Sequence, residues 1–274
     1  MKAFLVTTIA LTLSALLCST GSAQRGSSVE VKDPAGFAKL QGEPLFSGPQ
    51  PGEKLPPFAA TGVGGTIDGK EFDPAALAGD KPQVLVFQDD SRVGLRGLYG
   101  LKNSLSRIAN ESDEGLRLAA VFLSDDASSI LERVARLASE DFLIGVSKDG
   151  RDGPGAYGLN RNVAQTIIIA KDGKVLYNFP FAQPLLYPDP YVLGAIAEVL
   201  GEDRETLAKW LIEGQREAQQ MREEQRMRND DSRREEIIKR FDKDGDGTLN
   251  EEEGMAARSA LQSREEYVRA GEQP

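Results

Sequence analysis

Short apolar runs alternate with helix-like patterns between residues 51 and 202. The runs Gln83–Gln88 and Leu116–Ser124 are almost wholly apolar, which is typical of parallel strands buried on both faces. Two further runs, Thr166–Ala170 and Lys174–Phe179, are β-prone, and the Asp-Gly pair between them predicts a tight hairpin turn. The region therefore contains at least four strands, two of them in a hairpin.

Two other segments of this region repeat apolar residues at the spacing of an amphipathic helix. Ser129–Ser139 precedes the hairpin and Tyr191–Leu200 follows it. The resulting β-α-β-α-β-β-α order predicts an α/β domain over residues 51–202, with a central sheet and helices on both of its faces.

The composition changes after residue 202. Residues 203–231 are rich in Glu, Arg and Gln and have few apolar residues after Ile212, which predicts a solvated helical spacer. Ser232 is expected to cap a new helix, because Glu235 stands at capping-box spacing. The C-terminal part is thus predicted to be all-helical. An alternative is that the spacer binds a partner through its apolar residues, which are Leu207, Trp210, Leu211, Met221 and Met227.

The first residues have the pattern of an export signal. Met1-Lys2 is followed by the apolar stretch Ala3–Cys18 and then by small residues before Gln24. We expect residues 1–23 to be a signal peptide cleaved after Ala23, leaving no transmembrane span in a periplasmic or secreted protein. Lipidation of Cys18 is an alternative, which the large Leu17 before it disfavours. Residues 24–50, rich in Gly, Ser and Pro, are expected to be a flexible leader or a loosely docked arm.

Composition excludes several kinds of chemistry. Cys18 is the only cysteine and the chain has no histidine. Cys–His and Ser–His–Asp catalysis and His-ligated zinc are therefore excluded, and removal of the signal would leave no thiol. With 43 acidic and 33 basic residues the formal net charge is -10, which disfavours nucleic acid as a partner.

The segment 242–253 matches the twelve-position calcium loop of an EF-hand. Gly247 stands at position six, where the chain must turn sharply, and the apolar Leu249 at position eight is expected to pack behind the loop. All ligands would be hard oxygen atoms, which suits Ca²⁺ better than Mg²⁺. The predicted ligands are the side chains of Asp242, Asp244, Asp246, Asn250 and Glu253 and the backbone carbonyl of Thr248.

The predicted EF-hand region, residues 232–265, contains one such loop. A lone hand lacks the partner that normally preorganises it, so we expect weak binding, with a dissociation constant of about 10⁻⁴ to 10⁻³ M as in extracellular modules. It is expected to stabilise structure constitutively. It could pair with the hand of a second copy, with a different surface of its own chain or with a protein partner.

Three segments of the α/β region resemble the thioredoxin-like redoxin family, which includes peroxiredoxins and thiol-disulfide oxidoreductases. Pro51–Ala60 resembles the opening segment of that family, and residues 82–109 resemble its first core strand, active-site turn and following helix. Residues 162–179 resemble its closing hairpin. The resemblance implies a thioredoxin-like fold for residues 51–202.

The sequence departs from this family where its chemistry resides. Ser91 and Gly94 stand where a Cys-x-x-Cys pair would fall, and Gln165 replaces the cis-proline, so that peptide is expected to be trans. We therefore expect no catalytic or cofactor-binding residues, a redox-inactive domain and a protein that is not an enzyme. An alternative is non-cysteine chemistry, with Asp89 and Asp90 as an acid–base pair. The simpler interpretation is that these carboxylates stabilise the loop and cap the helix, and that Ser91 is not a nucleophile.

The sequence as a whole predicts an exported calcium-binding protein. A non-catalytic thioredoxin-like module is joined by a helical spacer to one EF-hand. The alternatives are a thioredoxin-fold enzyme that works without cysteine and a module that assembles when calcium binds.

Overall fold

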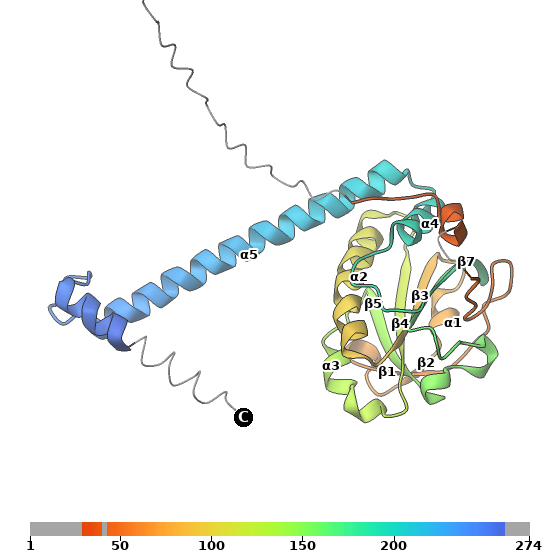
Figure 1. Cartoon of the computed structure of the whole chain (residues 1–274), viewed down its shortest axis with the longest axis horizontal. Helices are drawn as coiled ribbons and strands as arrows, with labels where there is room; N and C mark the ends of the chain where they lie inside the picture. Colours follow the sequence, from red (N-terminus) through yellow and green to blue (C-terminus); the bar gives the residue numbers. More distant parts are fainter. Residues whose placement is uncertain (1–28, 40–42, 261–274) are drawn as a thin grey trace, which may run out of the picture.

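The computed structural model describes residues 29–39 and 43–260. The predicted signal segment 1–23, with Cys18 and the cleavage point after Ala23, lies outside these residues. So does the end of the predicted EF-hand region, residues 261–265. The described chain forms a rounded α/β domain from which one long helix, α5, projects (Figure 1).

A mixed sheet of seven strands forms the centre of the domain, in the order β2-β1-β5-β4-β3-β6-β7. β3, β4 and β5 are mutually parallel, and the pairs β1·β2, β1·β5, β3·β6 and β6·β7 are antiparallel. The strands are β1 Ala60–Gly62, β2 Glu71–Phe72, β3 Gln83–Asp89, β4 Arg117–Leu123, β5 Phe142–Ser147, β6 Gln165–Lys171 and β7 Lys174–Phe181. The four strands expected from the sequence are confirmed, and Asp172 and Gly173 take positive φ in the hairpin turn.

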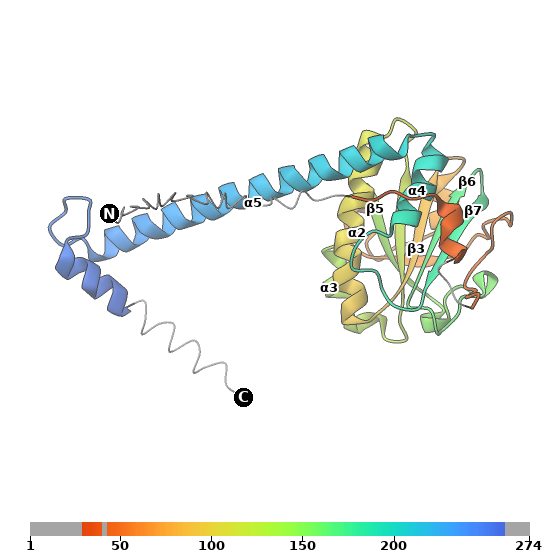
Figure 2. The ribbon, with the colours of Figure 1, turned by 45° about the horizontal axis from the view of Figure 1, so that its top comes forward.

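The longer helices of the domain gather on one face of the sheet (Figure 2). The helices are α1 Pro74–Ala78, α2 Arg92–Glu111, α3 Leu131–Ala135, α4 Pro190–Leu200 and α5 Arg204–Phe241, and the 3₁₀ helices are η1 Pro34–Lys39, η2 Gly65–Ile67, η3 Ala127–Ser129, η4 Gly150–Asp152 and η5 Gly155–Tyr157. α2, α3, α4 and the start of α5 share one apolar cluster with the sheet. The opposite face is covered by α1, η5 and loops. The predicted α/β class with flanking helices and a helical C-terminal part is confirmed.

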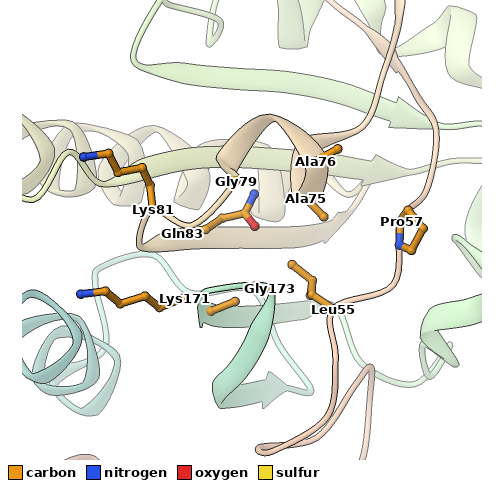
Figure 3. Close-up of a pocket in the computed structure, with 10 residues that line it drawn as sticks. Leu55, Pro57, Ala75, Ala76, Gly79, Lys81, Gln83, Lys171 and Gly173 are labelled. Carbon is orange, nitrogen blue, oxygen red and sulfur yellow. The ribbon is translucent and has the colours of Figure 1, made fainter.

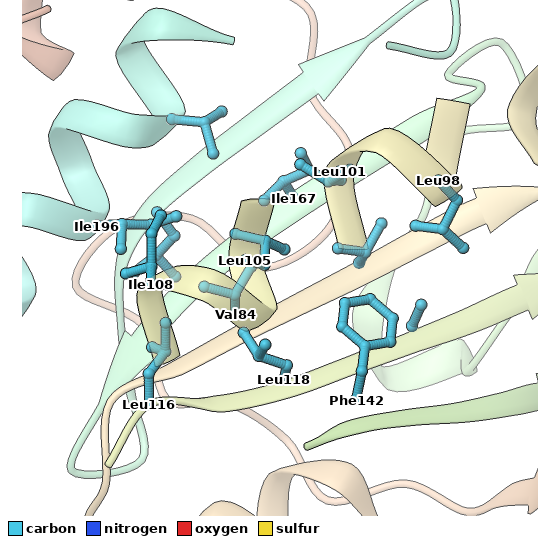
Figure 4. Packing of buried hydrophobic residues seen from close by; sticks show 14 of the residues in the cluster. Val84, Leu98, Leu101, Leu105, Ile108, Leu116, Leu118, Phe142, Ile167 and Ile196 are labelled. Carbon is cyan, nitrogen blue, oxygen red and sulfur yellow. The ribbon is translucent and has the colours of Figure 1, made fainter. Parts of the chain in front are cut away.

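Successive side chains of β3 point to opposite faces of the sheet, so the strand contributes to an apolar core on each face. Val84 and Val86 face α2, while Leu85 and Phe87 face the other side, and all four are 1% exposed or less. α2 contributes an apolar stripe at helical spacing, and these residues pack on the sheet beside α4, with Ile108 next to Ile196 (Figure 4). The fully buried residues of that stripe are Leu98, Leu101, Leu105 and Ile108.

The arm before the domain is docked in both of its described parts. In residues 29–39, the ring of Phe37 meets Phe179 edge-to-face at 4.8 Å between centroids, and the Lys32 N–H donates to the Pro190 carbonyl at 2.9 Å. In residues 43–50, the buried hydroxyl of Ser47 lies 2.7 Å from that of Thr166. The segment expected as a flexible leader or loosely docked arm is therefore anchored to the sheet and α4 at these points.

α5 begins in the core and ends far from it. Asp203 caps its first turn, Leu207 and Leu211 are buried, and Arg107 of α2 pairs with Glu217 at 2.8 Å. Residues 219–236 are all exposed. The 38-residue helix is roughly 57 Å long at 1.5 Å per residue.

The helix runs without a break through Ser232, so the new helix expected to begin there does not form. The residues around this position are mostly Glu and Arg, which favour helix, and Ser232 itself is too weak to interrupt them. Among the described residues, no helix is apolar over enough of its length to cross a membrane.

Two tyrosines of the domain should ionise late in an alkaline titration. The buried Tyr157 hydroxyl donates to the Pro56 carbonyl at 2.9 Å, and burial raises its pKa strongly. Burial and a 2.6 Å hydrogen bond to Glu198 raise the pKa of Tyr177 to about 12. In the unfolded chain both hydroxyl groups should have a pKa of about 10.

We therefore expect the absorbance of the folded protein at pH 11 to show incomplete ionisation of its six tyrosines. Because the neutral forms are favoured in the folded state, this contribution to stability is complete below pH ~10 and is lost as the pH rises above it. Tyr157→Phe should remove one late step. Ionisation of all six tyrosines near pH 10 without unfolding would contradict this assignment.

Candidate metal centre

A loop with two left-handed glycines joins α5 to a final helix over residues 251–260. The loop begins at Asp242, whose backbone N–H donates to the Ile238 carbonyl at 2.8 Å and ends α5. Gly245 and Gly247 have φ of 76° and 83°, a conformation that other residues rarely adopt. The chain therefore reverses sharply within a few residues, and it does so at the position where the loop motif requires a glycine.

The turn brings three of the predicted ligands together. Carboxylate oxygens of Asp242, Asp244 and Asp246 all lie within 4.8 Å of one another. Asp242 accepts backbone N–H groups from Gly245 at 2.6 Å and Gly247 at 2.8 Å. These bonds fix its orientation, and the one from Gly247 contributes most to holding the pKa of Asp242 below its usual value. The charged form of Asp242 is thus favoured at the point where the three side chains converge.

Glu253 closes the loop from the first turn of the final helix. Its side chain is 3% exposed, and its two oxygens accept the backbone N–H groups of Lys243 at 2.6 Å and Asn250 at 3.1 Å. It stands outside the group of three aspartates and is held against the two ends of the loop. No salt bridge to Glu253 is present in the part of the chain that the structure describes.

The remaining predicted ligands lie at the edge of the loop. Asn250 caps the final helix by accepting the Glu253 N–H at 3.1 Å, and its amide reaches Asp244 at 3.4 Å. The Thr248 hydroxyl donates to Asp246 at 2.8 Å, so its side chain serves the loop while its carbonyl stays the predicted ligand. All six predicted ligands thus belong to one connected turn.

The turn after β3 is the second place where the sequence suggested chemistry. Ser91 caps α2 by accepting the Gly94 N–H at 3.0 Å, and it donates to Asp89 at 2.8 Å. Asp90 instead accepts the hydroxyl of Ser124 at 2.7 Å. The two carboxylates are therefore held by different partners, as loop and helix-cap groups are.

A pair of buried glutamines lies beneath this turn, and sequence reasoning missed it. Gln88 and Gln165 are opposite each other in β3 and β6, are 0% and 1% exposed, and share a hydrogen bond of 2.7 Å. Gln88 also donates to Asp89 at 2.8 Å, and the Leu185 N–H reaches Gln165 at 3.4 Å. The described chain contains no cis peptide, so the trans geometry expected where Gln165 replaces proline is confirmed.

No family model and no curated protein sequence matches the chain. Solved structures do resemble it. One, described as a thiol:disulfide interchange protein DsbE from Chlorobium tepidum, is 20% identical with a TM-score of 0.42 and covers 58% of this chain and 100% of its own. A protein described as a disulfide isomerase from Bacteroides thetaiotaomicron is 17% identical with a TM-score of 0.44, covering 60% and 99%. A thiol peroxidase from Chromobacterium violaceum is 15% identical with a TM-score of 0.40, covering 57% and 89%. The mixed sheet with flanking helices has the layout expected for the thioredoxin-like domain predicted over residues 51–202.

The prediction that the protein is not an enzyme is contradicted by the same comparison. The similar structures are described as thiol-disulfide oxidoreductases and a peroxidase. The prediction rested on the absence of cysteine at Ser91 and Gly94, which removes one kind of reacting group and does not decide whether the domain has an activity. The description of the domain as non-catalytic and redox-inactive is therefore not kept. At these identities the likeness shows the fold and assigns no reaction.

Proposed function

We propose that this protein binds Ca²⁺ through the loop 242–253 at the end of α5. The observation that carries the proposal is the convergence of Asp242, Asp244 and Asp246 to within 4.8 Å in a turn closed by the buried Glu253. Three carboxylates at this distance repel one another, and a buried carboxylate is unfavourable without a cation nearby. A divalent cation in the loop relieves both costs.

The donor set fits calcium. The proposed ligands are oxygen atoms only: the side chains of Asp242, Asp244, Asp246, Asn250 and Glu253 and the carbonyl of Thr248. Ca²⁺ accepts six to eight such ligands in flexible geometry, whereas Mg²⁺ requires a stricter octahedron and keeps several waters. A small movement of Glu253 from the backbone N–H groups that it now accepts would add its two oxygens to the ion.

Self-association through the hand is a second candidate, supported by a surface pocket beside the loop. The pocket has a volume of about 390 Å³ and is lined by the apolar Ile237, Ile238 and Leu249 and by the charged Asp230, Arg233 and Arg234. Such a mixed surface next to a lone hand is suited to a second copy of the hand or to another protein. Calcium would favour assembly by ordering the loop that forms one wall.

Export of the chain, with cleavage after Ala23, also belongs to this proposal. It is supported by the pattern of residues 1–23. In an exported protein, calcium binding with a dissociation constant of about 10⁻⁴ to 10⁻³ M would suffice for occupancy.

Calorimetric titration of the protein tests the proposal. We expect one saturable Ca²⁺ site per chain with a dissociation constant of about 10⁻⁴ to 10⁻³ M, and much weaker binding of Mg²⁺. The double variant Asp242→Ala, Glu253→Ala should show no saturable heat. Absence of Ca²⁺ binding at millimolar concentration in the parent protein would refute the proposal. Sedimentation with and without Ca²⁺ then tests self-association, which an unchanged mass would exclude.

A further inference from the structure

A groove opens beside α2 where α5 crosses it and leaves the domain (Figure 1). Its volume is about 690 Å³, and small-molecule sites commonly have volumes of about 300–1,000 Å³. α2 forms one wall, and α5 from Leu211 to Arg222 forms another. The groove therefore ends well before the proposed calcium loop begins at Asp242, and it is a separate part of the molecule.

Uncharged polar side chains line both helical walls of this groove. α2 contributes the amides of Asn103 and Asn110, and α5 contributes those of Gln215 and Gln219. Within the described chain none of these four amides makes a hydrogen bond, so their donors and acceptors are free for a ligand. Each amide can donate and accept at the same time.

Buried polar atoms without a partner are concentrated at the same groove. In the described part of the chain four buried side-chain oxygen or nitrogen atoms have no hydrogen-bond partner, and three belong to residues of this groove. They are Oγ of Ser106, Oγ of Ser139 and Nε of Arg107. Such atoms are unfavourable unless water or a ligand supplies a partner.

The charges of the groove largely balance. Arg107 pairs with Glu111 at 3.0 Å and with Glu217 at 2.8 Å. Although partial burial of Asp141 opposes it, the nearby hydroxyls of Ser106 and Ser139 hold the pKa of this carboxyl below its usual value. The charged Asp141 faces the remaining cations of the lining, Lys102 and Arg222, so the groove does not select an anion.

Tyr187 adds an exposed aromatic side chain to the lining, with 79% of its surface exposed. The segment that carries it passes close to α2 because two glycines leave room. A Cβ at Gly97 would overlap the Leu185 carbonyl oxygen, and one at Gly100 would lie 3.1 Å from the Leu186 carbonyl oxygen. The backbone before Tyr187 is thus held against the helix, which places an aromatic ring beside the polar wall.

The hollow at the start of β3 has the opposite character. Its volume is about 160 Å³, and mainly apolar side chains line it between α1 and the β6–β7 turn (Figure 3). Gln83, its buried polar side chain, already donates to the Pro74 carbonyl at 2.7 Å. This hollow offers a ligand no comparable set of hydrogen bonds.

We propose that the groove between α2 and α5 binds a short neutral oligosaccharide. One sugar ring would stack on Tyr187, because one face of such a ring carries C–H groups that pack on an aromatic surface. The sugar hydroxyls, which donate and accept as amides do, would bond to Asn103 and Gln219. The inference does not rest on calcium binding.

Heteronuclear NMR of the full-length protein in buffer containing EDTA tests this proposal. The probes are maltotriose, cellotriose and triacetylchitotriose. At least one should bind saturably at millimolar concentration and shift the backbone amides of residues 100–110 and 214–222. Sorbitol, which has the hydroxyls but no ring, should bind about tenfold more weakly because it cannot stack.

Three results of these titrations would overturn the proposal. The first is that none of the three oligosaccharides binds. The second is that sorbitol produces the same shifts at the same concentration, which would show only general solvation by hydroxyl groups. The third is equal binding of a triserine peptide, which would reassign the groove to peptides.

Substitutions at exposed positions locate the binding without disturbing the core. Tyr187→Ala should weaken the binding of the sugar about tenfold, and Tyr187→Phe should restore it, because the ring is retained. Gln219→Leu should weaken it about fivefold, the effect of one hydrogen bond. Tyr99→Ala is the matched control, since Tyr99 lies on α2, is 43% exposed and is not part of the groove lining. Equal losses for Tyr187→Ala and Tyr99→Ala, or no loss for either, would place the sugar elsewhere and contradict the proposal.

Discussion

Replacing Glu253 by glutamine should weaken Ca²⁺ binding by at least about 100-fold. Changes to groups that only orient metal ligands commonly cost 10- to 100-fold in affinity, and Glu253 is the proposed bidentate ligand itself. The amide would keep the size of the side chain and one oxygen, and it would lose the charge and the second ligand atom. Calorimetry should therefore record no saturation up to ~10 mM Ca²⁺, well above the expected dissociation constant of about 10⁻⁴ to 10⁻³ M.

Glu252→Gln is the matched control. It makes the same change in charge one residue earlier, at an exposed position that accepts no hydrogen bond from the loop in the described chain. A general electrostatic effect would weaken binding similarly in both variants. If Glu253 coordinates the ion, the Ca²⁺ dissociation constant of the Glu252→Gln protein should stay within about twofold of the parent value, as expected for a screened surface charge. Equal losses in both variants would contradict the ligand assignment.

The effect of calcium should remain local to the end of α5. Residues 219–236 are exposed along the helix and span roughly 27 Å between the docked part and the loop. The contacts that anchor α5 to the domain, including Leu207, Leu211 and the Arg107–Glu217 pair, all precede this stretch. If the loop binds calcium as proposed, we therefore expect the ion to act on what the loop contacts, such as a second copy or a partner, and not on the turn after β3.

The parts of the fold that the sequence predicted are those whose signal is local. β3 and β4 are continuous apolar runs, and the Asp-Gly pair specifies the β6–β7 turn within two residues. β5, Phe142–Ser147, was missed although it is largely apolar, because it is short and is interrupted by Gly145. That glycine is required by tertiary packing, since a Cβ there would lie 2.8 Å from the ring of Phe72. No local pattern could indicate this contact.

The difference between local and non-local signals also explains which sites could be predicted from the sequence. The proposed metal loop is twelve consecutive residues, so its ligands could be predicted from spacing alone and stay a prediction. The Gln88–Gln165 pair joins residues 77 positions apart, so its formation depends on how β3 and β6 pair in the folded sheet. The sequence did offer one signal for this pair, which is a glutamine at the end of each apolar strand. Because a buried amide needs a hydrogen-bond partner, two such glutamines suggest a pair.

Phe142→Ala should destabilise the domain by about 3–5 kcal/mol. Phe142 begins β5, is 0% exposed and packs on the α2 side of the sheet near Leu98 and Leu118 (Figure 4). Removing its ring leaves a cavity that the surrounding strands and helix can only partly close. For a domain of this size the melting temperature should fall by roughly 10 °C. Denaturant unfolding followed by fluorescence of Trp210, which packs against the same cluster, measures the loss.

Leu143→Ala separates burial of Phe142 from disruption of the strand. Leu143 is the next residue of β5, only partly buried, and it packs on the opposite face of the sheet. Its truncation leaves β5 in place and should cost about 1–2 kcal/mol, which is less than the loss at Phe142. If the two variants lost the same free energy, β5 would stabilise the domain mainly through its hydrogen bonds to β1 and β4 and not through the ring of Phe142. If the α2 side of the sheet holds the main core of the domain, Phe142→Ala must lower the free energy of unfolding more than Leu143→Ala does.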